Sequence, residues 1–467
     1  MSKRPNIIVY LSDQQRADTL GCYGQKLPIS PVLDELAKDG VLFENAFTCQ
    51  PVCGPARACL QTGKYPNLTG SFVNEIGLKL DENTIAKELN HAGYETAYVG
   101  KWHLASNFKE DVVMVKKPIP LERMGGYKDY IMVSEALELT SHGYDGYVFD
   151  KDGNQVDFIG YRTDCITDLA VHYLQNKTSD NPFFMFISHI EPHQQNDMNC
   201  YEGPDNSKEK YKDYEVPKDL LDGKYEGDWK ANYPDYLGQC RKLDDNLGKL
   251  IDTLKEKGMF EDTVIIYTTD HGCHFKTQEG EYKRNVFDSC LRIPMVLYGG
   301  PFRGGVRSDR VVSLIQVPTT ILQLAQVKIP EDMIYESFQD TLTAETWEDV
   351  AFYHISETQL GRGIRTKKWK YSVHAPHVQP LMRMDEHFTT EGFYRMLMNS
   401  KPGSDSYIEQ YLFDLEADPY EKNNLVSDPE LKDIRAQLAQ ILCRCMERAG
   451  EKAPAIYPAN TELPKQY

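Results

Sequence analysis

The chain of 467 residues carries little positive charge. Its 52 lysines and arginines stand against 70 aspartates and glutamates, which gives a formal net charge of -18. Nucleic-acid binding requires a basic face, so this balance argues against a nucleic-acid partner. It does not exclude an anionic substrate, because a few buried lysines and arginines can dominate the potential of a pocket.

Long apolar stretches are also missing. No run reaches the length that crosses a membrane, so we expect no membrane partner. Residues 1–15, MSKRPNIIVYLSDQQ, lack the long apolar segment and the small-residue cleavage site of a signal peptide. We therefore expect a cytoplasmic location for the chain as given, and a periplasmic or secreted one if a leader has been removed.

The eleven cysteines show no regular spacing. There is no C-x-x-C pair or cysteine–histidine zinc pattern, and Cys443 and Cys445 stand too close together for one. The odd number argues against a disulfide framework and favours a mostly reduced compartment. The sequence also contains no internal repeat or low-complexity tract, and it leaves the oligomeric state open.

What the chain does contain is an alternation of short apolar runs and amphipathic segments. Strands are predicted over 6–12, 95–100, 182–190, 263–270 and 294–300, and helices over 30–40, 84–93, 167–176, 243–258 and 316–326. Such alternation predicts a sheet with helices on both faces. Residues 105–160 and 194–235 are rich in Tyr, Asp, Lys and Gly, and we interpret them as long insertions over a site.

The pattern changes near residue 345. From there the segments VAFYHISE, GIRTKKWKYSVH and QYLFDLEADPYEKNNL are typical of strands and turns, and residues 429–448 of a helix. We predict a catalytic domain over residues 1–345 and a smaller C-terminal α+β subdomain over residues 346–467.

Polar side chains follow the ends of several predicted strands. They are Asp13, Lys101, His103, His193, Asp270 and His271. Sheets of this kind place their sites beyond the carboxyl ends of their strands. These side chains are therefore the first candidates for chemistry.

The segment CGPARACLQTG, residues 53–63, combines a bend with the start of a helix. An isolated cysteine is most often a small buried hydrophobe. Here Cys53, Pro55, Arg57, Thr62 and Gly63 together make the frame C-x-P-x-R-x-x-x-x-T-G, which chance rarely produces. Arg57 stands one helical turn after Cys53, on the same side of the helix.

This frame resembles the signature of the sulfatase family, in which the cysteine is oxidised after translation to formylglycine. The resemblance extends over nearly the whole chain, through GKWH, DHG, a lysine ahead of RIP and the closing segment LFDLEADPYEKNNL. It implies an α/β fold, an alkaline-phosphatase-like α/β/α sandwich with a large mixed sheet, and a C-terminal α+β domain with a short antiparallel sheet. It also implies hydrolysis of a sulfate ester on a sulfated sugar or glycan fragment, after the action of a formylglycine-generating maturase.

The resemblance further implies a set of catalytic residues. The hydrated aldehyde made from Cys53 carries two hydroxyls; one attacks sulfur, and deprotonation of the other lets sulfate leave. Arg57 lies beside this diol, and Lys101 and Lys283 bind the sulfate. His103 deprotonates the diol, whereas His193 protonates the leaving oxygen.

One metal ion is expected beside the nucleophile. The implied ligands are Asp13, Gln14, Cys53 in its oxidised form, Asp270 and His271. Carboxylates favour a hard cation, so Ca²⁺ is the first choice. The family usually has two acidic residues at the first position, whereas Gln14 offers only a neutral amide oxygen. Gln14 is therefore a weak ligand or none, and Mg²⁺, Mn²⁺ or Zn²⁺ stay open.

Three further residues are weaker candidates for substrate binding, namely His189, His274 and Arg365. His189 is the rival of His193 for the role of general acid, and a satisfied strand-end histidine is the alternative interpretation. His274 follows the DHG segment and could line the pocket, or pack in the core. Arg365 of the smaller domain could touch a sugar, although a solvated strand edge is equally compatible.

Two other functions are compatible with these residues. Related phosphonate monoester or phosphodiester hydrolases carry the cysteine frame with an Asp-Gln first pair and an Asp-His second pair, and both pairs are present here. Two lysines suited to sulfate oxygens favour the sulfatase. An inactive glycan-binding relative would have lost at least one catalytic residue, and all six are present.

Overall fold

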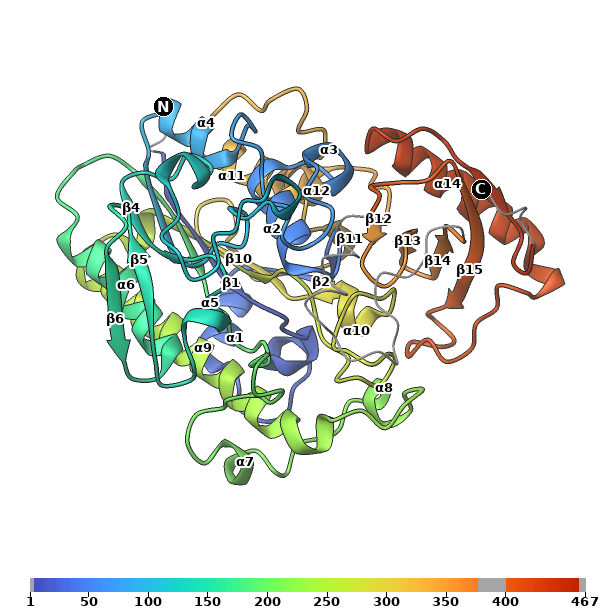
Figure 1. The fold of residues 1–467 in the computed structure, drawn as a ribbon, viewed down its shortest axis with the longest axis horizontal. Helices are drawn as coiled ribbons and strands as arrows, with labels where there is room; N and C mark the ends of the chain where they lie inside the picture. The colour runs from blue at the N-terminus through green and yellow to red at the C-terminus, as the bar shows by residue number, and fades with distance from the viewer. Residues whose placement is uncertain (1–3, 377–399, 462–467) are drawn as a thin grey trace.

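The structure, a computed structural model, describes residues 4–376 and 400–461 (Figure 1). Eleven strands form one mixed sheet in the order β11-β2-β10-β8-β1-β7-β3-β4-β5-β6, with β9 paired to β2. They are β1 (Asn6–Ser12), β2 (Val41–Phe47), β3 (Glu95–Lys101), β4 (Tyr130–Ser134), β5 (Asp145–Asp150), β6 (Gln155–Ile159), β7 (Phe183–Ser188), β8 (Thr263–Thr269), β9 (Arg292–Ile293), β10 (Met295–Tyr298) and β11 (Val306–Ser313). The predicted large mixed sheet is confirmed.

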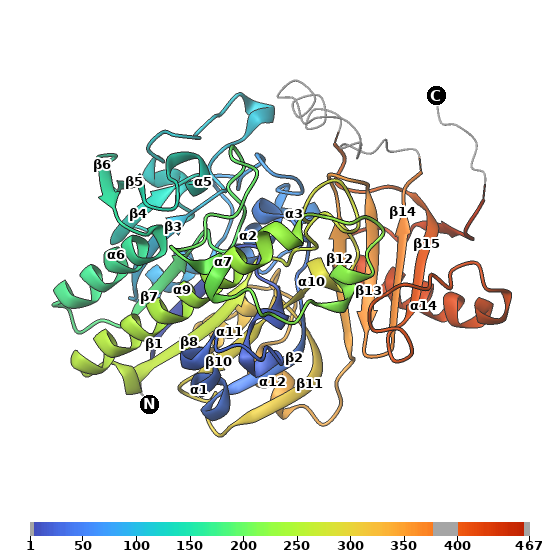
Figure 2. The same ribbon diagram turned by 90° about the horizontal axis from the view of Figure 1, so that it is seen from below.

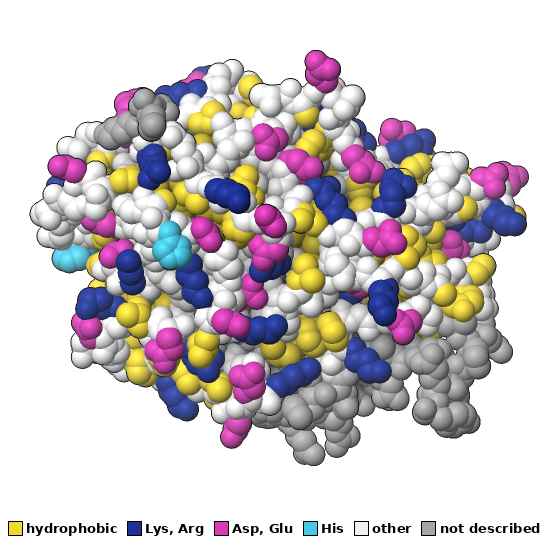
Figure 3. All heavy atoms as spheres, turned by 90° about the horizontal axis from the view of Figure 1, so that it is seen from above, with side chains coloured by type: hydrophobic (Ala, Val, Ile, Leu, Met, Phe, Trp, Pro, Cys, Tyr) yellow, Lys and Arg dark blue, Asp and Glu magenta, His cyan; other side chains and the backbone are white. Residues whose placement is uncertain are grey.

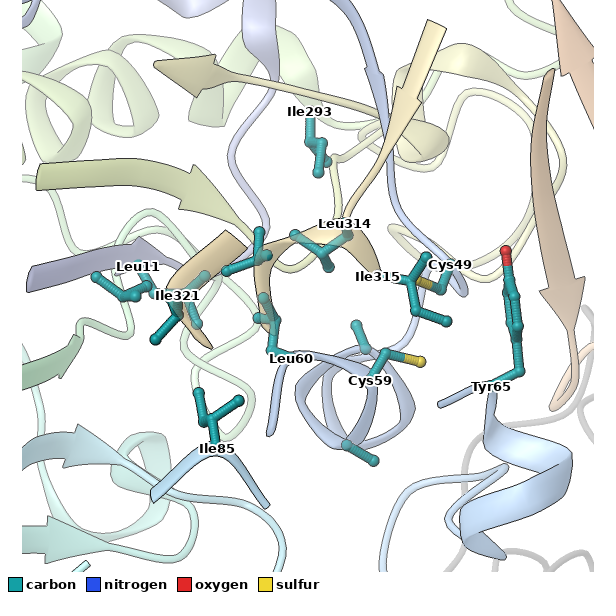
Figure 4. Packing of buried hydrophobic residues seen from close by; sticks show 14 of the residues in the cluster. Leu11, Cys49, Cys59, Leu60, Tyr65, Ile85, Ile293, Leu314, Ile315 and Ile321 are labelled. Carbon is teal, nitrogen blue, oxygen red and sulfur yellow. The ribbon is translucent and has the colours of Figure 1, made fainter. Parts of the chain in front are cut away.

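Helices cover both faces of this sheet, because its central strands send apolar side chains alternately into two cores. Along β1, Val9 and Leu11 pack on one side, and Ile8 and Tyr10 on the other. The covering helices are α2 (Cys53–Thr62), α4 (Ile85–His91) and α11 (Gln316–Leu324) on the first side, and α1 (Pro31–Asp39), α6 (Arg162–Asn176) and α9 (Trp229–Glu256) on the second. Figure 4 shows Leu11 beside Ile321 in the first core, and Figure 2 shows α6 next to α9. The predicted α/β/α sandwich is confirmed.

Four neighbouring strands, β8, β1, β7 and β3, run parallel to one another. Ser12 of β1 lies opposite Thr269 of β8, and Gly100 of β3 lies opposite Ser188 of β7. The carboxyl ends of all four strands therefore reach one edge of the sheet, and the residues that follow them emerge side by side.

The interpretation of residues 105–160 as an insertion over the site is wrong in part. This stretch contains β4, β5 and β6, which extend the large sheet beyond β3. β4 joins β3 in parallel, whereas β5 and β6 add antiparallel. β6 alternates exposed and half-buried side chains, so it lacks the continuous apolar run by which a buried strand is recognised.

Helix α9 begins at Trp229, inside the second stretch that we interpreted as an insertion, and not near residue 243. Pro234 within the helix is locally unfavourable, because it lacks a backbone N–H. Tyr233, however, is fully buried and lies edge-on to Phe275, with ring centroids 5.4 Å apart. Tertiary packing thus holds the segment helical despite its local sequence.

The second sheet lies in the C-terminal part of the chain beside α14 (Lys432–Arg448). Its strands are β12 (Val350–Ile355), β13 (Gly361–Thr366), β14 (Trp369–His374), β15 (Ser406–Asp414) and β16 (Ala455–Tyr457). The first four pair antiparallel, and β16 pairs parallel to β15. The predicted antiparallel sheet is thus right for four strands and misses one parallel strand. The domain boundary after residue 345 stays a prediction.

The two sheets are joined through the segment that carries Cys53. The hydroxyl of Tyr65 donates to the carbonyl of Phe352 at 3.0 Å, and the amide of His354 donates to the carbonyl of Cys49 at 2.8 Å. Phe352 also belongs to the same apolar cluster as the buried residues of α2. The C-terminal sheet is therefore bonded to the chain on both sides of α2.

Three general features complete the description. All eleven cysteines are free thiols. Within residues 4–376 and 400–461, no helix combines the length and the hydropathy needed to cross a membrane. On the face shown in Figure 3, basic and acidic side chains are intermixed, so the negative charge is not gathered into one patch there.

Candidate active site

Side chains from three strand ends and one helix start meet at the carboxyl edge of the large sheet. Asp13 follows β1, Lys101 ends β3, Asp270 follows β8, and Cys53 begins α2. Each of the four has 0% of its surface exposed. The structure thus brings together the residues that the sequence places at strand ends and at the start of the cysteine frame.

Four potential metal ligands form the centre of this cluster. One donor atom each from Asp13, Cys53, Asp270 and His271 lies within 4.8 Å of all the others. The Sγ atom of Cys53 is 3.2 Å from Nε2 of His271 and 3.5 Å from Oδ1 of Asp13. Nδ1 of His271 donates to the carbonyl of Gly272 at 3.0 Å, so the lone pair of Nε2 faces the cluster.

Gln14, the fifth predicted ligand, follows Asp13, and its backbone amide donates to Oδ1 of Asp270 at 3.1 Å. Its side-chain amide nitrogen donates to Oε1 of Gln194 at 2.7 Å and to the hydroxyl of Tyr201 at 3.1 Å. Its own Oε1 is buried without a hydrogen-bond partner, which is costly unless a ligand supplies one. The backbone of Gln14 has φ 67°, an uncommon conformation for this residue that is typical of functional sites. These residues fit one divalent cation.

The surroundings of Cys53 favour a negative charge at its sulfur. Burial alone would raise the pKa of the thiol, but Lys283, Lys101 and His271 outweigh burial and hold the pKa well below its usual range. Lys283 is the nearest of these charges, with Nζ 2.9 Å from Sγ. The site is therefore organised to stabilise negative charge at residue 53.

Arg57 orients the two carboxylates of the cluster. Its guanidinium donates to Oδ2 of Asp13 at 3.0 Å and forms an ion pair with Oδ2 of Asp270 at 3.3 Å. It also donates to the hydroxyl of Ser188 at 2.6 Å. Because Arg57 follows Cys53 by one helical turn, the same helix positions Cys53 and the two carboxylates.

Two histidines of the predicted catalytic set flank Cys53. Nδ1 of His193 donates to the carbonyl of Gln194 at 2.6 Å, and its Nε2 accepts from Nζ of Lys283 at 3.0 Å. Burial and Lys283 lower the pKa of His193. Burial would lower the pKa of His103 as well, but its contacts with Cys53 and Glu75 raise that pKa to about 10. The two histidines therefore favour opposite protonation states.

Sequence reasoning missed several polar residues that support the cluster. Glu138, in the short helix α5 (Leu137–Thr140), accepts from Nζ of Lys101 at 3.0 Å. Glu75 lies 3.1 Å from Nε2 of His103. Asn74 accepts from the amide of Gly54 at 2.9 Å. These residues lie in segments without a strand-end position or a matched motif, so no local signal marks them.

The three predicted substrate-binding residues lie outside the cluster. His189 is fully buried on the opposite side of the sheet, where its ring is 4.8 Å from that of Tyr10. Ser188 points toward Arg57, and alternation along the strand sends the next side chain the other way. Burial lowers the pKa of His189 to about 4.

His274 and Arg365 are likewise held elsewhere. His274 is fully buried, and its Nδ1 accepts from the amide of Gln278 at 3.4 Å. Arg365 forms an ion pair with Asp288 at 3.3 Å and lies over the ring of Phe47. The structure therefore gives neither residue a contact with Cys53. His274 packs in the core, whereas Arg365 is a buried ion-pairing residue and does not lie at a solvated strand edge.

Known protein families and relatives match this chain. Residues 5–327 match the family model described as Sulfatase, and residues 280–385 match the one described as N-sulphoglucosamine sulphohydrolase, C-terminal. The chain is 26% identical to an N-acetylglucosamine-6-O-sulfatase of Bacteroides thetaiotaomicron, an alignment that covers 97% of this chain and 88% of that protein.

Solved structures share the fold. A protein in complex with its substrate D-glucosamine-2-N,6-O-disulfate aligns with a TM-score of 0.73 and 24% identity over 96% of this chain and 98% of the other. A phosphonate monoester hydrolase of Agrobacterium radiobacter aligns with a TM-score of 0.71 and 19% identity over 96% of each chain. Such identities establish the fold alone. Because the family model spans residues 5–327, most of the chain, this protein belongs to the sulfatase family and is a sulfuric ester hydrolase.

Proposed function

We propose that the chain hydrolyses a sulfate ester on a sulfated sugar or glycan fragment, with a formylglycine made from Cys53 as its nucleophile. The observation that carries this proposal is the position of Cys53. Its sulfur lies between Lys283, His271 and Asp13 in a buried cluster that favours negative charge. The printed names of the glucosamine sulfatase relative and of the glucosamine disulfate complex support a sugar as the substrate.

We propose Ca²⁺ as the metal, because three of the four protein donors are oxygens. Asp13, Gln14, Asp270 and His271 would hold it beside residue 53. Bound there, the cation would lower the pKa of a hydroxyl on residue 53 and shield the charge of sulfate. Arg57 keeps Asp13 and Asp270 in place for this task.

His193 is proposed to protonate the leaving oxygen. Its Nε2 accepts from the ammonium of Lys283 at 3.0 Å. An anionic ester would attract that ammonium and would raise the pKa of His193, so that Nε2 could carry the proton. The bond from Nδ1 to Gln194 holds the ring in the required orientation.

His103 is proposed to deprotonate the second hydroxyl of residue 53. Glu75 lies 3.1 Å from Nε2 and fixes the ring, and the buried Nδ1 of His103 has no hydrogen-bond partner. Oxidation of Cys53 to a neutral diol would remove the sulfur that helps to raise the pKa of His103, so the ring could lose its proton and act as the base. Proton removal then lets the carbonyl re-form as the bond to sulfate breaks. This step would be common to every substrate.

Maturation of Cys53 is tested by coexpression with a formylglycine-generating maturase. Peptide mass spectrometry should show an aldehyde at residue 53, and Cys53→Ala should abolish turnover while keeping the unfolding temperature. Cys53→Ser should stall as a sulfated serine, because it lacks the second hydroxyl that expels sulfate. Appreciable turnover by Cys53→Ala would rule out the proposed nucleophile.

The substrate class is tested with matured protein on sulfated monosaccharides and disaccharides, beside a phosphonate monoester and a phosphodiester. We expect the highest kcat/KM on a sugar sulfate. A higher kcat/KM on the phosphonate or the phosphodiester would favour the other function that the fold supports. Retained glycan binding without any turnover would indicate the inactive relative.

A further inference from the structure

Glu138 is a charged residue of the cluster for which the chemistry above has no role. Its side chain is 6% exposed, and its Oε1 accepts from Nζ of Lys101 at 3.0 Å. The backbone carbonyl of Glu138 accepts from the side-chain amide Nε2 of Gln195 at 2.7 Å, which holds α5 in place. The second carboxylate oxygen, Oε2, is buried without a hydrogen-bond partner. The chain thus keeps a buried, only partly hydrogen-bonded carboxylate in a site for an anion. Such burial costs free energy, so this carboxylate is expected to have a role in the site.

The two sulfate-binding lysines differ in their counter-charges. Lys101 lies 3.0 Å from carboxylates on both sides, Asp13 and Glu138. Lys283 makes no ion pair with a carboxylate of the described residues, and its ammonium contacts Cys53 and His193. Asp13 would share its charge with a bound cation. Glu138 would then be the main counter-charge of Lys101.

The carboxyl group of Glu138 also remains ionised. Burial would raise its pKa, but Lys101, His193 and His103 outweigh burial and lower it. A fixed negative charge beside Lys101 weakens the binding of every anion in the site, including the inorganic sulfate that the reaction releases. Tight binding of substrate and product alike does not raise kcat, because it lowers their energies together with that of the transition state.

We propose that Glu138 is a positioning residue that holds Lys101 and offsets part of its charge, so that inorganic sulfate leaves the site readily. This inference rests on the proposed function. It assigns to Glu138 control over anion affinity, and not a contact with the reacting atoms.

The test measures the Kd of inorganic sulfate by calorimetry on matured, metal-loaded protein. Glu138→Gln keeps the shape and removes the charge. It should tighten sulfate binding roughly 10- to 100-fold, the effect of one neighbouring charge. KM should fall, and kcat should fall as release becomes slower. Weaker or unchanged sulfate binding in a folded variant would overturn the proposal.

Two further variants keep the result interpretable. Glu138→Met removes the charge without adding an N–H donor, so it should also tighten sulfate binding. Tightening in Glu138→Gln alone would indicate a new hydrogen bond and contradict the proposal.

Glu261→Gln is the matched control, because Glu261 is 77% exposed in a surface pair with Arg303. It should change neither Kd nor kcat. If wild-type protein binds sulfate but cleaves no sulfate ester, the proposed function fails, and this outcome is distinct from a failure of the proposal for Glu138.

Discussion

At the scale of single residues, the site depends on the direction in which each side chain leaves its strand. Ser188 ends β7 and binds Arg57, whereas His189 points into the opposite core. The chain then turns, and His193 returns to within hydrogen-bonding distance of Lys283. Of these two histidines four positions apart, only His193 contacts the cluster around Cys53.

The two histidines should therefore respond differently to substitution. His193→Ala should lower turnover of a sugar sulfate by roughly 10²–10⁴, the usual contribution of general acid catalysis, and should affect nitrophenyl sulfate far less. Nitrophenol can leave as its anion without being protonated, whereas a sugar alcohol is a poor leaving group and needs the proton. Turnover across leaving groups of graded pKa measures the difference.

The control for this experiment is His189→Leu. Both ring nitrogens of His189 are buried without hydrogen-bond partners, so an apolar residue of similar size should preserve or raise the unfolding temperature. Its leaving-group dependence should equal that of the wild type. A steeper dependence in His189→Leu, with none in His193→Ala, would exchange the two roles.

The metal ligands should also rank by donor strength. Asp270→Asn removes a buried carboxylate and should lower turnover by several orders of magnitude, whereas Gln14→Ala removes a weak amide donor and should cost less. Elemental analysis of each variant should show the bound metal lost in the same order. Full turnover by exhaustively chelated wild-type protein would contradict a metal-dependent mechanism.

At the scale of secondary-structure elements, one helix caps another. The N-terminus of α1 has no cap from its own N-cap side chain, Ser30. Instead, the amides of Val32 and Leu33 donate to the carboxylate of Asp244 in α9, at 3.0 and 2.8 Å. Asp244 is 2% exposed, so this carboxylate both satisfies two buried donors and joins the helices that cover one face of the sheet.

Removal of this cap has a predictable pH dependence. Asp244→Ala should lower the free energy of unfolding by about 2 kcal/mol, because two buried N–H groups lose their acceptor. Burial raises the pKa of Asp244 to about 6, so the folded state binds the proton more tightly than the unfolded chain. The stability that Asp244 contributes therefore declines as the pH rises from about 4 to about 6, and the loss on substitution should be smaller at pH 7 than at pH 5.

Urea unfolding at several pH values checks this prediction. Asp245→Ala is a suitable control, because the neighbouring Asp245 is 43% exposed in a surface pair with Arg241. It should change the free energy of unfolding by less than about 0.5 kcal/mol. An equal loss in Asp244→Ala at all pH values would contradict the raised pKa.

At the scale of the whole molecule, the two sheets share one apolar cluster. Val9 and Leu11 of the large sheet and Phe352 and Ile364 of the small one belong to it, with α2 between them. Exposure of this cluster to water would destabilise both sheets. Cys53 stands at the start of α2, so the candidate site depends on both sheets although its clustered side chains follow strands of the first.

Calorimetry should therefore show a single unfolding transition for the full chain, with both sheets lost together. Residues 1–345 expressed alone should lack a cooperative transition, because the apolar cluster that includes α2, Phe352 and Ile364 would be partly exposed. Two separate transitions, or a stable fragment 1–345, would show that the predicted domains fold independently.

The family and the alternating layers could be recognised from the sequence alone, which also predicts a catalytic set. The cysteine frame and the polar residues after β1, β3 and β8 can be recognised because strand ends and short motifs are local signals. Tertiary structure alone decided which side chains meet. Pleating placed His189 on the far face, packing made residues near Tyr233 helical, and α5 brought Glu138 to Lys101. Such contacts join residues far apart in the chain, and no local pattern of residue types encodes them.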